Sequence, residues 1–79
     1  MEDQDQSKTV KSTIEYWENE EREVRFHFEV LSNFITDGVV GKTLLVGSVQ
    51  EKALTYALYA VRSKLVDCRS QATSLKGLL

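Results

Sequence analysis

The sequence contains one histidine, His27, and one cysteine, Cys68, which are the residue types of a nucleophile and its general base. Such a pair needs both side chains within hydrogen-bond reach and a third group that orients the base. In a hairpin of two helices the pair would lie roughly 20 Å apart at the rise of a helix. We therefore predict no catalytic pair. Cys68 is expected to be a small core residue, and His27 to face solvent or the edge of an interface.

Residues 37–43, with the sequence DGVVGKT, resemble the phosphate-binding loop of small GTPases. That pattern is glycine, four residues, and then Gly-Lys-Ser/Thr. Thr36 stands where the first glycine is needed, and the strand before the loop and the later Asp-x-x-Gly and Asn-Lys-x-Asp motifs are missing. Gly41, Lys42 and Thr43 are the residues that could contact a phosphate. The preferred interpretation is a turn punctuated by glycines.

Acidic residues cluster between Glu15 and Glu23. Carboxylates that are neighbours on a helix fan around its axis, whereas a bound cation needs several oxygens that converge on it. A zinc site is also hard to build with one cysteine and one histidine. We therefore expect a solvated or ion-paired face, no metal, no cofactor and no enzymatic activity.

Basic residues repeat every seven positions in the second half of the chain, at Arg62, Arg69 and Lys76, with Lys64 close by. Such a stripe could follow a phosphate backbone, and a small dimeric protein that binds duplex RNA is the alternative function. Charges that flank a heptad seam more usually pair with a neighbouring helix. The first forty residues carry a net charge of −6 and the remainder +4, so pairing between the two halves is the preferred interpretation.

The first predicted helix covers residues 13–36 and follows a flexible polar tail at residues 1–11. Ser12 and Glu15 have the spacing of a capping box, and Gly38 can take the left-handed conformation that ends a helix. The alternation of apolar and polar residues over 24–30 would also suit a strand. Helix is preferred because the heptad-like series is more than twice as long. That series is Ile14, Trp17, Val24, Phe28, Leu31 and Ile35, with Glu21 as the polar exception.

The second predicted helix covers residues 49–76. Ser48 and Glu51 form another capping-box pattern, and Lys76 and Gly77 mark the end. Two such helices joined by a short apolar connection predict an all-α antiparallel hairpin, forming one domain over residues 12–79. Its second apolar seam steps alternately by four and three residues, through Leu54, Leu58, Val61, Leu65, Cys68, Ala72, Leu75 and Leu79.

A hairpin of this size can bury only a thin core, since a chain of 79 residues buries only about 60% of the surface that its unfolded form exposes. With one cysteine it cannot form an internal disulfide, so oligomerisation is the expected source of further stability. Phe26, Val30 and Phe34 form a second apolar ridge that the hairpin leaves without a partner. We therefore predict a dimeric helical bundle. The predicted interface consists of Val24, Phe26, Phe28, Val30, Leu31, Phe34, Ile35, Leu54, Leu58, Tyr59 and Val61.

The predicted function is a non-catalytic module for protein–protein interaction or assembly. Its partner would be a second copy, or another helical protein if the chain acts as an adaptor or small chaperone. A single cysteine suits a reducing compartment. No apolar run is long enough for a membrane span, and the acidic N-terminus is not that of a secretory signal. We expect an intracellular and cytoplasmic protein, with a nuclear location also open.

Overall fold

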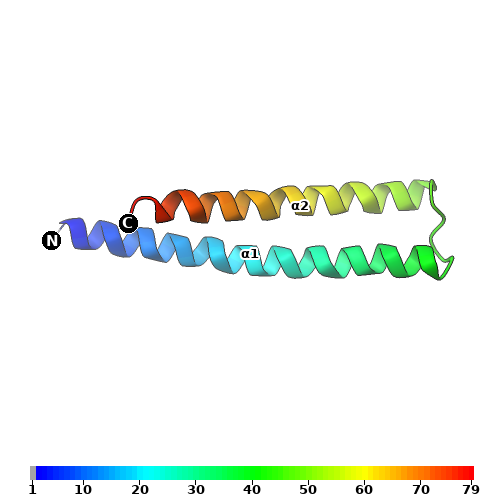
Figure 1. Ribbon diagram of the computed structural model, residues 1–79, viewed down its shortest axis with the longest axis horizontal. Coiled ribbons are helices and arrows are strands. Elements are labelled where there is room, and N and C mark those ends of the chain that lie inside the picture. The colour runs from blue at the N-terminus through cyan, green and yellow to red at the C-terminus, as the bar shows by residue number, and fades with distance from the viewer. Residues whose placement is uncertain (1) are drawn as a thin grey trace.

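Two α-helices lie side by side and run in opposite directions (Figure 1). The computed structural model describes residues 2–79, and side chains from Lys8 onward. Helix α1 spans Glu2–Val40, helix α2 spans Val49–Lys76, and residues 41–48 connect them. The rod measures 61 × 15 × 13 Å. The described residues contain no strand, so the all-α prediction is confirmed and the strand alternative for residues 24–30 is wrong.

The two predicted seams face each other along the hairpin. Val24, Leu65 and Cys68 form the centre of the core, and Trp17 and Val61 pack against them. The small side chains of Cys68 and Ala72 let the helices approach closely, because they occupy little of the space between the backbones. The buried apolar side chains belong to the half of the hairpin away from the connection, at Ile14, Val24, Leu65, Cys68 and Ala72.

Helix α1 begins at Glu2, so the predicted start near Ser12 is wrong. Ser12 lies inside the helix and is exposed, and it caps nothing there. The sequence has no proline, and no glycine before Gly38, so no residue interrupts the helix at this point. Val10 is half-buried and extends the seam by one step before Ile14. Met1, the first residue of the predicted tail, lies outside the described residues.

Helix α1 ends at Val40, four residues beyond the predicted end at Thr36. The left-handed residue is Lys42, with a φ of 61°. The Thr43 N–H donates to the Gly38 carbonyl at 2.9 Å, and the Lys42 N–H donates to the Val39 carbonyl at 3.2 Å. These two bonds make a Schellman motif in which Lys42 takes the position that glycine usually occupies. The prediction was wrong because it assigned the left-handed position to the nearest glycine.

Gly38 has a packing role instead. A Cβ at this position would lie 2.9 Å from the Cβ of Leu44, which is closer than real Cβ contacts. The missing side chain lets the connection fold back onto the last turn of α1, and Leu44 is half-buried there. The apolar connection is therefore packed against the helix that precedes it.

Helix α2 has the bounds that the sequence predicts. The Glu51 N–H donates to Ser48 Oγ at 3.1 Å, so Ser48 is the N-cap. The Ser48 N–H donates to the Leu45 carbonyl at 3.1 Å. Gly47, with a φ of 84°, makes the turn that leads into the cap. A capped start and an apolar period of the same length explain why this helix was predicted accurately.

We expect Lys42→Gly to stabilise the hairpin by about 0.5 to 1 kcal/mol. Lysine pays a steric cost in the left-handed region that glycine does not, and this relief exceeds the extra backbone entropy of glycine in the unfolded chain. Urea unfolding followed by circular dichroism measures the change. Lys42→Ala is the matched control and should give no such gain. Equal stabilisation by both variants would contradict a left-handed conformation at this position.

Candidate interaction surface

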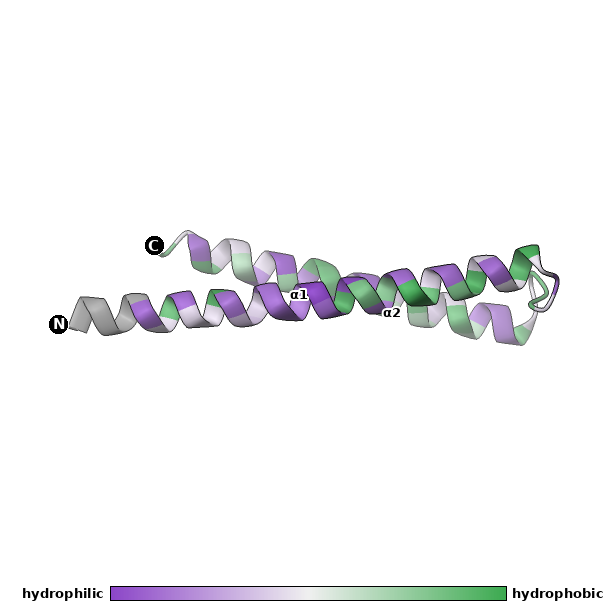
Figure 2. Ribbon diagram, turned by 90° about the horizontal axis from the view of Figure 1, so that it is seen from below, coloured by the Kyte–Doolittle hydropathy of each residue, from purple (hydrophilic) through white to green (hydrophobic). Residues whose placement is uncertain are grey.

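Exposed apolar side chains gather in the half of the hairpin next to the connection, which we call the loop half (residues 25–64). Green segments recur along this half of both helices in Figure 2. All of its side chains are described, and none is fully buried. Apolar side chains gain free energy when they leave water, and this half leaves many in contact with it. Its exposed large apolar residues are Phe26, Val30, Phe34, Val40, Leu45, Val46, Val49, Tyr56 and Tyr59.

Heptad positions show which of these residues share a face. The seam residues occupy positions a and d, so positions g and c lie on one side of the seam and positions e and b on the other. In an antiparallel pair the g side of one helix adjoins the g side of its neighbour. Glu18 and Lys76, which form an ion pair across the hairpin, both occupy e positions, as this geometry requires.

One side of the loop half carries apolar residues on both helices, between His27 and Asp37 on α1 and between Gln50 and Lys64 on α2. Counting from the seam residues Leu31 and Ile35, Val30 takes position c and Phe34 position g. On α2, the c and g positions from residue 53 to residue 60 are all alanines, and Gln50 occupies the g position before them. Together these residues are called the apolar flank, which consists of Val30, Phe34, Ala53, Ala57 and Ala60.

The ion pair between Glu21 and Arg69 fixes the register of the two helices. Nine residues further along α1 and nine residues earlier along α2, Val30 lies level with Ala60. Phe34 is one helical turn nearer the connection, in line with Ala57 within one residue. The apolar flank is therefore a strip in which two large side chains on α1 lie beside three alanines on α2.

Polar side chains are more buried than apolar ones on the two sides of the seam, which is the opposite of what hydrophobicity favours. Ser32 and Thr55, at e positions, are half-buried between the helices. Phe34 and Ala57, at g positions, are exposed, and 63% of the Phe34 surface contacts solvent. A hairpin that had only its own core to form would turn the phenylalanine inward and the serine outward. This arrangement leaves the apolar flank available for contact with another helix.

A shallow hollow continues the apolar flank toward the connection. Phe34, Asp37, Gly38, Thr43 and Leu44 line it. The Thr43 hydroxyl donates to the Gly38 carbonyl at 3.3 Å, which holds this wall of the hollow. The surface is thus concave at Gly38, which has no side chain, and convex at the neighbouring ring of Phe34.

The structure divides the predicted interface residues into three groups. Val24 is buried in the hairpin core, and Phe26, Val30, Phe34 and Tyr59 are exposed. Tyr59 occupies position b and lies on the opposite side of the seam from Val30. The alanines of the apolar flank were absent from the predicted interface, although their spacing at c and g positions identifies them. The remaining members are half-buried in the seam, namely Phe28, Leu31, Ile35, Leu54, Leu58 and Val61.

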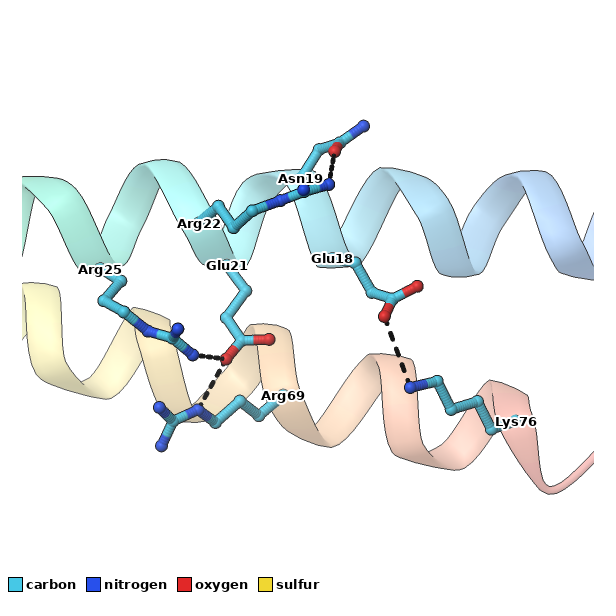
Figure 3. A network of polar contacts seen from close by, with 7 residues as sticks. All are labelled: Glu18, Asn19, Glu21, Arg22, Arg25, Arg69 and Lys76. Atoms are coloured by element: carbon cyan, nitrogen blue, oxygen red, sulfur yellow. Dashed lines mark hydrogen bonds and ion pairs between the residues drawn. The ribbon is translucent and has the colours of Figure 1, made fainter.

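A network of ion pairs joins the helices at the other half of the hairpin (Figure 3). Arg69 Nε donates to Glu21 Oε1 at 2.8 Å, and Arg25 Nη2 donates to the same oxygen at 2.5 Å. Lys76 Nζ lies 3.5 Å from Glu18 Oε2. The predicted pairing between the acidic first half and the basic second half is confirmed at these positions.

The basic stripe is therefore only partly available to a nucleic acid. Arg69 and Lys76 are engaged by carboxylates of α1. Within the described part of the chain, Arg62 and Lys64 form no ion pair. They occupy positions e and g, on opposite sides of the seam, so they do not form one continuous patch.

The Arg69 guanidinium, by donating a hydrogen bond to Glu21, lowers the pKa of that carboxyl below its ordinary value of 4.5. Partial burial opposes this shift, and the positive charge of Arg25 adds to it. Because the folded pKa lies below the unfolded one, the carboxylate stabilises the fold at neutral pH. That contribution is lost as the pH falls through the folded pKa.

Cys68 is almost completely buried, with 1% of its surface exposed. Burial raises the pKa of its thiol, and the neighbouring Glu20 carboxylate adds to the shift. A buried thiol with a raised pKa is a poor nucleophile at neutral pH. His27 is exposed and has the ring of Phe26 as its aromatic neighbour, with the centroids 6.3 Å apart. In the register set by Glu21 and Arg69, Cys68 lies only about 8 Å from His27 along the helix axis, so the predicted separation of roughly 20 Å is wrong. The two residues still face different surroundings, because Cys68 is buried in the seam and His27 is exposed to solvent.

The glycine-rich stretch around Lys42 does not have the arrangement of a phosphate-binding loop. In that motif the loop connects a strand to the start of a helix, where free N–H groups point at the phosphate. Here Gly41, Lys42 and Thr43 follow the C-terminal end of α1. Their N–H groups donate to carbonyls of that helix. The prediction of a turn is confirmed.

Among the described residues no group of three or more His, Cys, Asp or Glu side chains is placed to hold a metal ion. Neither helix, over its described length, is apolar enough to cross a lipid bilayer.

Comparisons with protein-family models, with curated proteins and with solved structures give no match to this chain.

Glu21→Gln should weaken the pH dependence of stability. The wild-type melting temperature should fall as the pH is lowered from about 6 to about 3, because the unfolded carboxyl takes up its proton at a higher pH than the folded one. Without that carboxyl the fall should be smaller. Melting curves recorded by circular dichroism across this range measure it. Glu29→Gln removes an exposed carboxylate that forms no ion pair with another described residue, and it is the control that should keep the wild-type slope.

The Cys68 thiol should react with a soluble disulfide reagent only when the hairpin opens. We expect slow labelling of the native chain and fast labelling in urea, because burial shields the sulfur and raises its pKa. The absorbance of the released thiolate follows both reactions. Ser70→Cys in a Cys68→Ala background places a thiol on the exposed face and should label fast without urea. Equally fast labelling of native Cys68 would contradict its burial.

Proposed function

We propose that this chain is a non-catalytic helical module that works by docking another helical surface onto its loop half. One observation carries the proposal. The loop half has no fully buried residue, yet it exposes Phe26, Val30 and Phe34 on α1 and two tyrosines on α2. Aromatic side chains of this kind are the usual anchors of protein interfaces, since each buries a large apolar area.

The exposed area of the chain supports this proposal. It is 6242 Å², whereas a compact monomer of 9.0 kDa is expected to expose about 4,900 Å². The exposed large apolar side chains of the loop half supply part of the excess. A stable interface of ordinary size buries about 800 Å² on each partner, which the excess can accommodate.

The ion pairs favour this function over binding of duplex RNA. Arg69 and Lys76 are tied to Glu21 and Glu18, so two of the four cations of the stripe already have partners. Binding a phosphate backbone would have to compete with those pairs. We propose assembly as the role, with a second copy as the first partner to test. An adaptor or chaperone role toward another amphipathic helix is the variant with a different partner. The single buried thiol is in keeping with the reducing cytoplasm that we propose as the location.

Phe34→Ser should weaken self-association by at least about tenfold in dissociation constant, because it removes a central aromatic anchor. Sedimentation velocity over a series of micromolar concentrations measures this. Since the Phe34 side chain is largely exposed in the single chain, its loss should leave the helical content of the monomer unchanged. Val66→Ser removes an exposed apolar side chain outside the loop half, at a b position on the opposite side of the seam, and is the control, which should associate like the wild type.

Two results would contradict the proposal. One is a wild-type chain that stays a folded monomer at micromolar concentration and captures no amphipathic helix. The other is tight binding of duplex RNA that weakens steeply between about 50 and 200 mM salt, which would assign the function to the basic residues instead.

A further inference from the structure

The apolar flank is self-complementary, because it contains both large and small side chains at matching heights. Val30 and Phe34 project from α1, and Ala53, Ala57 and Ala60 lie beside them on α2. A surface that carries its own knobs and holes suits a two-fold interface, in which the same patch serves on both molecules. What remains to be decided is which helix of one hairpin packs on which helix of the other.

We propose, as a step that rests on the function proposed above, that the occupant of the apolar flank is a second copy of this chain with its connection at the same end. The two-fold axis then runs parallel to the helices, and α1 of each chain packs on α2 of the other. Every helix in the resulting four-helix bundle has antiparallel neighbours.

Side-chain size favours this arrangement. A two-fold axis parallel to the helices keeps every residue at its own height, so Val30 and Phe34 meet Ala60 and Ala57 of the second copy. With the connections at opposite ends, α1 packs on α1 and α2 on α2. Large side chains would then meet large ones, and alanines would meet alanines across a gap. Interiors pack at high density and tolerate neither clashes nor voids, so large against small is the better match.

Charge favours the same choice. The side of α1 that carries the apolar flank also carries Glu20, Glu23 and Asp37 at its c and g positions, and no lysine or arginine. The same side of α2 carries one cation, Lys64, and one carboxylate, Asp67. Packing α1 on α1 would oppose two acidic strips, whereas packing α1 on α2 opposes an acidic strip to a neutral one. Glu23 then lies level with Asp67 of the other chain and within one helical turn of its Lys64, so these two charges of the neutral strip offset each other beside it.

The opposite side of the loop half is a poorer docking surface. Its e and b positions include Arg25, Glu29, Ser32 and Arg62. Burying them would cost the hydration of several charges, with few apolar groups to offset it. The two-fold contact is therefore assigned to the apolar flank, which leaves the ion pairs of Glu21 exposed as they are in the single chain.

Distances between spin labels on the two copies test the orientation. The labels are placed in full-length chains at Val46→Cys, in the exposed connection, and at Ser74→Cys, in the other half of α2. Each variant is made in a Cys68→Ala background that retains the wild-type helical content. With the connections at the same end, both positions should give distances of about 20 Å, set by the spacing of packed helices. With them at opposite ends, the helical rise places the labels about 30 Å or more apart at Val46 and about 40 Å apart at Ser74.

The outcomes separate this inference from the proposed function. Short distances at both positions, lost on adding Phe34→Ser, support the arrangement. Long distances at both positions, or a short one at Val46 with a long one at Ser74, overturn the arrangement but leave the assembly function standing. A chain that sediments as a monomer gives no distance between copies, which overturns both the two-fold contact and self-association.

Discussion

A layer of two helices can shield only the stripe that each turns toward the other, and this limit governs the rest of the structure. The hairpin meets it differently in its two halves. Away from the connection, small residues such as Cys68 and Ala72 let the backbones approach, and Val24 and Ile14 are sealed from water. Next to the connection, larger seam residues are only half-buried and further apolar groups lie outside the seam. The half away from the connection is packed like a protein core, whereas the loop half resembles one side of a protein–protein interface.

Electrostatics reinforces this division. Glu21, on the seam of α1, would be a misfit in an apolar stripe, yet it receives hydrogen bonds from Arg25 and Arg69. The carboxylate thus links the two helices beside the core residues Val24 and Cys68 and fixes their register. Pairs of this kind contribute little free energy at an exposed surface, but they select among alignments of similar apolar content. The register in turn sets which residues of the apolar flank lie at the same height.

Much of the hairpin follows from the sequence, because apolar period and capping are local signals. Both seams and the bounds of α2 could be predicted on those grounds. The ends of α1 could not: the pattern at Ser12 is that of a cap, but nothing before it stops the helix. The left-handed conformation was predicted for Gly38, but Lys42 adopts it. The close contact between Gly38 and Leu44 could not be predicted, because it depends on how the connection folds back onto α1. Phe26, Val30 and Phe34 were recognised as an unpaired ridge. The c and g positions of Ala53, Ala57 and Ala60 can be read from the sequence, whereas their heights beside Val30 and Phe34 follow only from the register.

Helix α1 is longer than α2, and its N-terminal turns extend past the end of its neighbour (Figure 1). The rod therefore has unlike tips: a folded-back apolar turn at one and an unaccompanied helix at the other. In the bundle inferred above, the N-terminal turns of both α1 helices would extend from the same end. The two ends of such a bundle differ. Two copies of any group attached to the N-terminal turns would be held side by side, at a spacing set by the width of the bundle.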